Sequence, residues 1–368
     1  MDRPIFKPVG TPMEELDTPS LVVDIDILDQ NIEKMHGYFA EREAKLRPHV
    51  EAHRSPAIAH KQIQAGGTVG GIAVTTLGQA EVFCQNGFND VLIINTVVTE
   101  QKINRLCNLA RQSKVTISVD SSKNAGDLSK AALDMGVNIK IVLNINGRLD
   151  RFGVQPGSNA VELAMLVRDL DGLAFDGLVS NECNALDFEF AALDRESRRC
   201  IEQLLSTKGM MEKAGLKVPV VGMLGTPNYE IAASIEGITD VIAGSYTLMD
   251  ERHREHLPQF QPAAKIMSSV TGIHEDLIIT DSGRKAVGAD FGLPAVNNIP
   301  GAECFSLSAE HGRIRVDSAS GVQKQLGDIV WLTPRDIGTC ANLHDYIHVV
   351  RGGVLEAIWG IPARGHYR

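Results

Sequence analysis

Hydrophobic residues in the first 255 positions fall into short apolar runs, typical of β-strands, separated by longer stretches that can hold helices. Many of the runs are almost continuously apolar, as at 91–94, which suits parallel strands covered on both faces. Caps or an early proline mark several helix starts, at Ser55-Pro56, Thr99-Glu100 and Ser122. The strand-like runs lie at 45–51, 70–75, 91–96, 115–120, 139–146, 174–182, 218–224 and 240–246, and the helical stretches at 28–43, 57–65, 77–87, 99–112, 123–136, 158–170, 186–215 and 229–236. This alternation predicts an α/β fold, a (β/α)8 TIM barrel over residues 25–255.

The pattern changes after about residue 255, where His256-Leu257-Pro258 and Gln261-Pro262 form a linker rich in breakers. Strand-like segments separated by turns follow at 263–272, 275–280, 302–308, 312–317, 328–333, 346–350 and 354–359. They predict a C-terminal all-β domain over residues 256–368. An N-terminal strand at 21–24 is expected to bring segment 1–24 into the same domain.

Composition narrows the range of functions. Apolar residues make up 43% and charged residues 22% of the 368 positions, as in soluble globular proteins. The formal net charge of −10 disfavours nucleic acid as a partner. No apolar run approaches the ~20 residues that span a bilayer, and Met1-Asp2-Arg3-Pro4 opens no signal peptide, so a cytoplasmic protein without a membrane partner is expected. The six cysteines form no CxxC pair, so a structural zinc site of the usual spacing is absent.

In a TIM barrel, chemistry takes place at the carboxyl ends of the strands. Polar residues at these ends are therefore the candidate site. They are His49, Glu51, His53, Asn95, Asp120, Asn146, Arg148, Arg151, Asn181, Glu182, Gly225, Thr226, Gly244, Ser245 and Tyr246.

Several motifs resemble those of D-threonine aldolases and eukaryotic-type D-serine dehydratases. They include Leu16-Asp17-Thr18-Pro19-Ser20, Arg47-Pro48-His49, Gly244-Ser245-Tyr246, Asp281-Ser282-Gly283-Arg284-Lys285 and Asn342-Leu343-His344-Asp345, and the resemblance covers nearly the whole chain in order. That family is similar to alanine racemase: a barrel that binds pyridoxal phosphate (PLP) plus a β-domain, working as a homodimer. The resemblance therefore implies a lyase with this architecture.

The chain departs from the family at the residue that matters most. The family motif is Arg-Pro-His-x-Lys-x-His-Lys, and its first lysine forms the imine with PLP. This chain reads Arg47-Pro48-His49-Val50-Glu51-Ala52-His53-Arg54. A carboxylate cannot form an imine, so covalently bound PLP is not expected.

Other family positions at the barrel mouth are also replaced. Asn181 stands in place of an aromatic residue, Glu182 in place of a histidine, and Asn146 in place of an aspartate, whereas Arg151 matches an arginine. The glycine-rich phosphate loop survives only in part, at Gly225-Thr226. The metal positions of the β-domain are Asp336 and Gly338, so one oxygen ligand is kept. The replacements cluster while the scaffold motifs persist, which favours a site adapted to a different use.

The remaining residues support several hypotheses about chemistry. His49, Glu51 and His53 lie at i, i+2 and i+4, so on a strand they would share one face and could hold a divalent metal, with Asp336 as a tentative further ligand. Alternatively, Glu51 and Glu182 could act as base and acid without a metal. Both hypotheses have structural alternatives. The histidines could be family residues that now only pack against a pocket wall, and the acidic residues could be paired with Arg148 or Arg151.

The substrate is expected to be a small anion. Backbone N–H groups at Gly225-Thr226 and Gly244-Ser245 could bind a phosphate or carboxylate, assisted by Arg148, Arg151, Asn181 and Tyr246. In the metal hypothesis the ion polarises the substrate oxygen, and Glu182 or His344 is expected to move the proton. The resulting prediction is an aldolase- or dehydratase-type lyase for a small hydroxy acid or hydroxy amino acid. The alternatives are a lyase that binds PLP noncovalently and a non-catalytic protein that binds a small anion.

Overall fold

The computed structural model describes residues 6–147, 150–180, 190–317 and 324–368. Contacts divide the chain into two compact units. The barrel unit comprises residues 34–51, 58–244 and 365–368, and the β-unit comprises the described part of 1–33, 52–57 and 245–364. This division falls at 244/245, earlier than the sequence boundary at 255/256. It also assigns the short segment 52–57, which interrupts the predicted barrel, to the β-unit.

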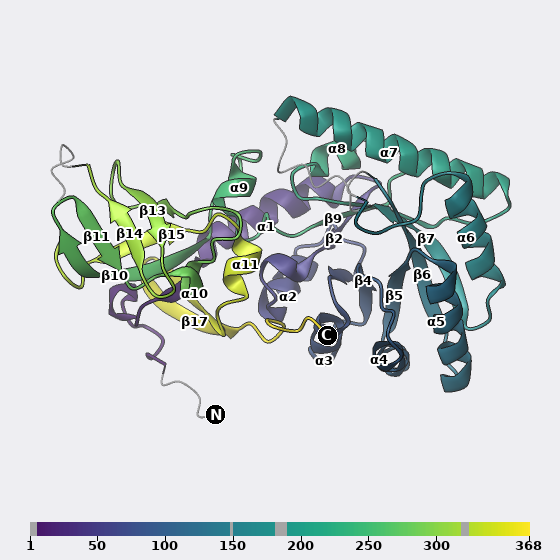
Figure 1. Cartoon of the computed structure of the whole chain (residues 1–368), viewed down its shortest axis with the longest axis horizontal. Helices are drawn as coiled ribbons and strands as arrows, with labels where there is room; N and C mark the ends of the chain where they lie inside the picture. Colours follow the sequence, from purple (N-terminus) through teal and green to yellow (C-terminus); the bar gives the residue numbers. More distant parts are fainter. Residues whose placement is uncertain (1–5, 148–149, 181–189, 318–323) are drawn as a thin grey trace. The chain divides into compact units, whose positions relative to one another are not determined.

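The barrel unit is built on an eight-stranded parallel sheet, in the order β2-β9-β8-β7-β6-β5-β4-β3 (Figure 1). The strands are β2 (Lys45–Pro48), β3 (Ile72–Val74), β4 (Asp90–Ile93), β5 (Lys114–Val119), β6 (Ile139–Ile145), β7 (Leu173–Ser180), β8 (Val220–Leu224) and β9 (Asp240–Ala243). Parallel bridges at Leu46↔Thr68 and His49↔Ala73 bring β2 back toward β3. The predicted TIM barrel is thus confirmed as a nearly closed barrel.

Helices alternate with the strands as the sequence predicts. They are α1 (Ile25–Ala40), α2 (Pro56–Gln64), α3 (Leu77–Gln85), α4 (Glu100–Ala110), α5 (Ser122–Met135), α6 (Ser158–Asp169), α7 (Phe190–Lys213) and α8 (Tyr229–Ala233). Pro56 is the first residue of α2, where a missing N–H costs nothing. The cap of α5 differs from the prediction: Ser121, not Ser122, accepts the hydrogen bond from the N–H of Asn124.

Apolar side chains fill the middle of the barrel. One buried cluster draws its members from six strands and the residue after one of them: Ala73, Leu92, Ile94, Val142, Val179, Leu224 and Ile242. Because successive residues of a strand point to opposite faces, the cluster identifies which residues of each strand face the interior. On β6, Asn144 has the parity of Val142 and therefore faces the same way.

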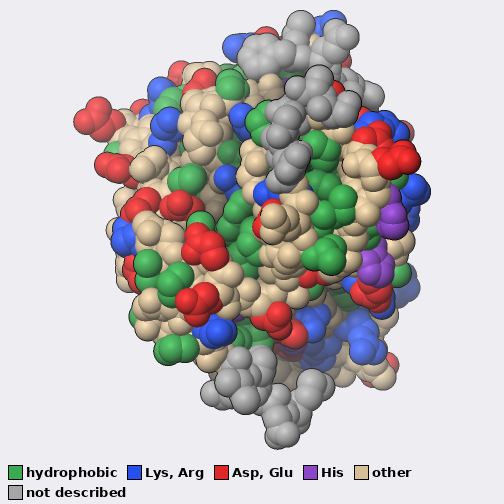
Figure 2. Space-filling model, turned by 90° about the vertical axis from the view of Figure 1, so that its left-hand side faces the viewer, with side chains coloured by type: hydrophobic (Ala, Val, Ile, Leu, Met, Phe, Trp, Pro, Cys, Tyr) green, Lys and Arg blue, Asp and Glu red, His purple; other side chains and the backbone are tan. Residues whose placement is uncertain are grey.

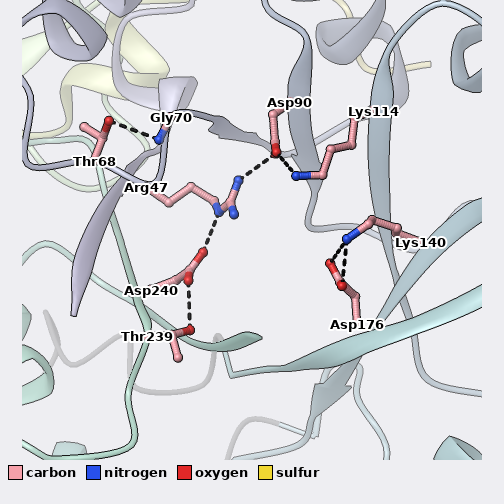
Figure 3. A network of polar contacts seen from close by, with 9 residues as sticks. All are labelled: Arg47, Thr68, Gly70, Asp90, Lys114, Lys140, Asp176, Thr239 and Asp240. Atoms are coloured by element: carbon pink, nitrogen blue, oxygen red, sulfur yellow. Dashed lines mark hydrogen bonds and ion pairs between the residues drawn. The ribbon is translucent and has the colours of Figure 1, made fainter. Parts of the chain in front are cut away.

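Charged side chains close the amino end of the barrel, which we call the floor (Figure 3). Arg47 donates from Nε to Asp240 Oδ2 at 2.8 Å and from Nη1 to Asp90 Oδ1 at 3.1 Å. Lys114 pairs with the other oxygen of Asp90. All four charges belong to the amino-terminal part of their strands or to the short β2, so the network joins four strands.

A second ion pair completes the floor. Lys140 donates from Nζ to both carboxylate oxygens of Asp176, at 2.8 and 2.9 Å. Asp176 lies in a β-bulge, since the register with β6 shifts between Phe175 and Gly177. Asp176 is the extra residue of this bulge, and its side chain reaches Lys140 on β6.

Within the residues that the structure describes, the β-unit contains nine strands in one connected sheet, with the path β13-β14-β11-β10-β1-β16-β17 and with β15 beside β10 and β12. The strands are β1 (Ser20–Asp24), β10 (Ala264–His274), β11 (Leu277–Thr280), β12 (Ala295–Val296), β13 (Glu303–Leu307), β14 (Gly312–Arg315), β15 (Ile329–Thr333), β16 (Tyr346–Arg351) and β17 (Val354–Gly360). The β1 strand lies between β10 and β16. Short helices α9 (Glu251–Arg254), α10 (Arg284–Val287) and α11 (Ile337–Ala341) accompany the sheet.

Surface charge in the view of Figure 2 is mixed. Acidic and basic side chains are interspersed with hydrophobic and uncharged ones on this face, so the excess of acidic residues forms no single patch there. Among the described helices, none is long and apolar enough to cross a membrane.

Candidate functional site

The predicted strand through His49, Glu51 and His53 ends early. Strand β2 stops at Pro48, and residues Val50–Ala52 form a 3-10 helix. The side chains at 49, 51 and 53 therefore do not alternate along a strand, and the expectation that they share one face is wrong. Proline at 48 lacks an N–H, which favours the end of a strand at this point.

Glu51 is held by the neighbouring strand–helix loop. Its Oε2 accepts hydrogen bonds from Thr75 Oγ1 at 3.0 Å and from Gln79 Nε2 at 2.7 Å. Gln79 is buried, and its Oε1 accepts from the N–H of Thr75 at 2.9 Å, so its amide orientation is determined. The carboxylate at position 51 is therefore oriented by side chains that follow β3 and begin α3.

The two flanking histidines have other surroundings. His49 donates its backbone N–H to Ala243 O at 2.9 Å, which aligns it with β9. His53 is fully buried in the β-unit, and its Nδ1 accepts from the N–H of Ser55 at 3.1 Å. In this contact Nδ1 is the acceptor, so Nε2 is the ring nitrogen left to donate.

Asp336, the tentative fourth ligand, is a helix cap. It accepts from the N–H of Thr339 at 2.8 Å and from its Oγ1 at 2.9 Å, at the start of α11. Within the part of the chain that the structure describes, no group of three His, Cys, Asp or Glu side chains is arranged to hold a metal ion. The described residues thus do not assemble the metal site predicted from His49, Glu51, His53 and Asp336.

The loop after β8 contains the predicted anion site at Gly225-Thr226. The N–H of Gly225 donates to Ile242 O at 3.0 Å, and Thr226 Oγ1 accepts from the N–H of Gly244 at 3.2 Å. Both glycine N–H groups are therefore satisfied within the barrel, and an anion at this loop would need other donors.

The side-chain Nδ2 of Asn228, a residue that was not predicted from the sequence, offers such a donor. It is 1% exposed, and neither Nδ2 nor Oδ1 has a hydrogen-bond partner among the described residues. Its side chain reaches back to Gly225, where a Cβ would lie 2.5 Å from Asn228 Oδ1. Glycine is needed at 225 for that approach and for its φ of +140°.

The end of β6 carries a second set of polar groups. Asn146, predicted from the family comparison, donates from Nδ2 to Asp150 Oδ1 at 2.8 Å, while its buried Oδ1 has no partner among the described residues. Asn144 is fully buried, and both atoms of its amide lack a partner there. Ser118 on β5 is likewise buried with an unpaired Oγ.

Asn144 and Ser118 were not predicted from the sequence, although a signal was present. Each is a polar residue near the carboxyl end of its strand, at a position with the parity of the barrel interior and between two apolar neighbours. Arg151, by contrast, is exposed, and its guanidinium lies 4.5 Å from the ring centroid of Phe152.

Three further predicted residues belong to the β-unit. Ser245 accepts from the N–H of Met249 at 2.8 Å, and Tyr246 is fully buried with its ring near Phe260. His344 places Nε2 2.7 Å from Ala286 O. Burial lowers the pKa of His344, partly opposed by that hydrogen bond, so the neutral ring donates from Nε2.

Arg148, Asn181 and Glu182 lie outside the described residues, so their predicted roles stay predictions. The same is true of the Glu51–Glu182 acid–base pair.

No lysine stands at the carboxyl end of a described barrel strand. An imine requires a primary amine at the carboxyl end of a strand, and position 51 holds a carboxylate. The lysines on the barrel strands are Lys45, Lys114 and Lys140, at the first or second position of β2, β5 and β6. All three bind acceptors there: Lys45 the carbonyls of Phe39 and Ala40, and the other two the floor carboxylates.

Sequence comparisons agree with this architecture. Residues 23–249 match the alanine racemase N-terminal domain, and residues 263–350 match a putative serine dehydratase domain. A D-threonine aldolase of Arthrobacter sp. is 31% identical, over 98% of this chain and 96% of that protein. A 3-hydroxy-D-aspartate aldolase of Paracoccus denitrificans is also 31% identical, over 97% of this chain and 94% of the relative. The crystal structure of D-threonine aldolase from Filomicrobium marinum superposes with a TM-score of 0.93 at 29% identity, covering 98% of this chain and 99% of that one.

Proposed function

The chain belongs to the D-threonine aldolase family, with its alanine racemase-type barrel and serine dehydratase-like domain, and we propose that it is a lyase that works without lysine-bound PLP. Its substrate is a small anionic hydroxy amino acid or hydroxy acid, cleaved at a carbon–carbon bond or dehydrated. The names of the relatives, which act on D-threonine and 3-hydroxy-D-aspartate, support this substrate class.

The observation that carries the proposal is the environment of Glu51. A carboxylate replaces the amine of the family, and two side chains hold it in one orientation. An oriented carboxylate at the carboxyl end of a barrel strand is suited to proton transfer.

Glu51 acts as the acid–base group in this proposal. In carbon–carbon cleavage it accepts the proton of the β-hydroxyl as the Cα–Cβ bond breaks, and an aldehyde leaves. The electron pair stays on Cα, next to the substrate carboxylate, and a proton returns to Cα. In dehydration Glu51 removes the proton from Cα, a protonated partner donates a proton to the β-hydroxyl, which leaves as water, and a Cα=Cβ double bond forms.

Charge that develops on the substrate carboxylate needs hydrogen-bond donors. The unpaired Nδ2 of Asn228 supports binding of such an anion near Gly225 and Thr226. Arg148, Arg151, Asn181, Gly244, Ser245 and Tyr246 remain the predicted further contacts, and Glu182 and His344 the predicted proton-transfer partners. No step is assigned to a metal, because the described residues offer no ligand set for one.

Turnover without cofactor tests the proposal. The full chain, treated to remove PLP and assayed with none added, is incubated with β-hydroxy amino acids and the matching hydroxy acids, and products are followed by NMR. We expect an aldehyde or a keto acid from at least one substrate. Turnover only after PLP is added would support noncovalent PLP instead. Binding of these compounds without turnover would support the non-catalytic alternative.

Two further properties remain proposals. A divalent metal would be revealed by elemental analysis of the purified protein and by loss of activity with chelator. The homodimer expected from the family would be revealed by light scattering at several protein concentrations.

A further inference from the structure

An acceptor-rich cluster lies at the mouth of the barrel where β5 and β6 end. We define it as Asp120, Asn144 and Asn146. The register pairs Val119 with Leu143, which places Asp120 beside Asn144 at the ends of neighbouring strands. Asn144 shares the interior-facing parity of Val142 on β6, and Asn146 and Asp120 directly follow the last residues of β6 and β5.

A returning segment holds the cluster together. Val154 donates its N–H to Asn144 O at 2.8 Å, and its carbonyl accepts from the N–H of Asn146 at 2.9 Å. The preceding Gly153 donates its N–H to Asp120 Oδ2 at 3.0 Å. A Cβ on Gly153 would lie 2.7 Å from Asn146 N, so only glycine permits this approach. Asp120 and Asn146 thus both lie against Gly153.

The cluster presents oxygen atoms. Asn146 directs its NH2 group to the Asp150 carboxylate, which can only accept, so its unpaired buried atom is an oxygen. Asn144 is fully buried with Oδ1 and Nδ2 both unpaired. Asp120 adds a carboxylate, which forms no ion pair within the part of the chain that the structure describes.

An unpaired amide in a buried position lowers the stability of the fold, so its retention calls for a ligand. Three oxygens including one carboxylate match a group with three N–H donors and a positive charge. A substrate carboxylate would be repelled by them, and a hydroxyl could donate only one hydrogen bond.

We propose that Asp120, Asn144 and Asn146 bind the α-ammonium group of the substrate. The inference rests on the proposed function and narrows its substrate class to amino acids that keep a free amine, which excludes hydroxy acids. The loss of the lysine at position 51 explains why such an ammonium site would be needed. In an enzyme that captures the amine as an imine, no ammonium site is needed, whereas this chain has lost the lysine and must hold the amine by hydrogen bonds.

The test uses ligands that cannot be cleaved. Each enantiomer of alanine and of lactate, which differ in ammonium against hydroxyl, is titrated into the full chain by calorimetry, with EDTA present. We expect one alanine enantiomer to bind at least about tenfold more tightly than either lactate. Asp120→Asn and Asn144→Leu should each weaken alanine binding about tenfold or more and leave lactate binding unchanged.

Asn124→Ala is the matched control. Asn124 is a buried asparagine of the barrel unit whose Nδ2 donates to Val97 O at 2.8 Å, and it forms no hydrogen bond with Asp120, Asn144 or Asn146, so its loss should change neither affinity. Equal binding of alanine and lactate, parallel loss of both in the variants, or failure of alanine to bind would overturn the inference. So would alanine binding that appears only when EDTA is omitted, which would assign the oxygens to a metal ion.

Because no turnover is involved, the result is independent of the proposed lyase. Cleavage of hydroxy acids in preference to amino acids would contradict the proposed ammonium site and leave the proposed lyase activity standing. Alanine-selective binding without any turnover would do the reverse.

Discussion

The two ends of the barrel treat polar side chains in opposite ways. At the floor, Arg47, Asp90, Lys114, Lys140, Asp176 and Asp240 all find partners within the barrel (Figure 3). At the mouth, Ser118, Asn144, Asn146 and Asn228 are buried with polar atoms that have no partner among the described residues. The same sheet thus carries satisfied charges at one end and unsatisfied amides at the other.

This difference separates stability from function. Unpaired buried polar groups reduce stability, and a fold retains them where a ligand completes their hydrogen bonds. Paired charges between strands need no ligand. Variants of the floor should therefore change unfolding, and variants of the mouth should change binding and turnover.

The largest effect is expected at Glu51. Glu51→Gln keeps the shape of the side chain but cannot accept a proton, so kcat should fall by about 10²–10⁴-fold while the thermal midpoint changes little. Steady-state kinetics and a thermal melt measure the two quantities. Unchanged kcat would remove Glu51 from proton transfer.

Breaking the floor should act on stability alone. Arg47→Met leaves Asp240, whose side chain is 5% exposed, without its partner, and should destabilise the barrel by about 3 kcal/mol. Denaturant unfolding measures the loss, and kcat per folded molecule should be unchanged. Lys140→Met is the control: Lys140 is 36% exposed, so its loss should cost at most about 1 kcal/mol. Equal losses of unfolding free energy in the two variants would contradict the larger contribution expected from the buried Arg47–Asp240 pair.

Replacing a buried polar side chain at the mouth with an apolar one should raise the free energy of unfolding, where breaking the floor lowers it. Asn144→Leu removes two unpaired amide atoms from a fully buried position, and should stabilise the ligand-free protein by about 1–2 kcal/mol. The same denaturant titration measures it. Marked destabilisation would mean that Asn144 is a structural residue, and the contrast between the two ends would lose its basis.

The smallest effect concerns pH. His36 on α1 is buried with Nδ1 2.7 Å from Gly66 O, and burial lowers its pKa despite that hydrogen bond. Because the unfolded chain takes up a proton near pH 6.5 and the folded chain does so only at lower pH, stability should fall as pH drops below about 6.5. Thermal midpoints between pH 5 and 7 should fall less steeply in His36→Gln. An identical slope would assign the pH dependence to other groups.

The sequence was informative where structure depends on local pattern. All eight barrel strands overlap the predicted runs, because each is an apolar run between helix signals. The mouth was harder, because its geometry comes from contacts distant in sequence. Glu51 is oriented by Thr75 and Gln79, and nothing in the alternation at 49–53 shows that β2 ends at Pro48. Asn144 could have been found, since a polar residue at an interior position of an apolar strand is itself a signal.

Trapping by reduction tests the central claim most directly. The purified, active protein is saturated with PLP, reduced with borohydride and analysed by mass spectrometry. Borohydride converts an imine between PLP and lysine into a stable amine, so a modified lysine would be retained through digestion. The account predicts no phosphopyridoxyl group on any lysine and unchanged turnover of the substrate. Stoichiometric modification of one lysine, together with loss of activity, would contradict it.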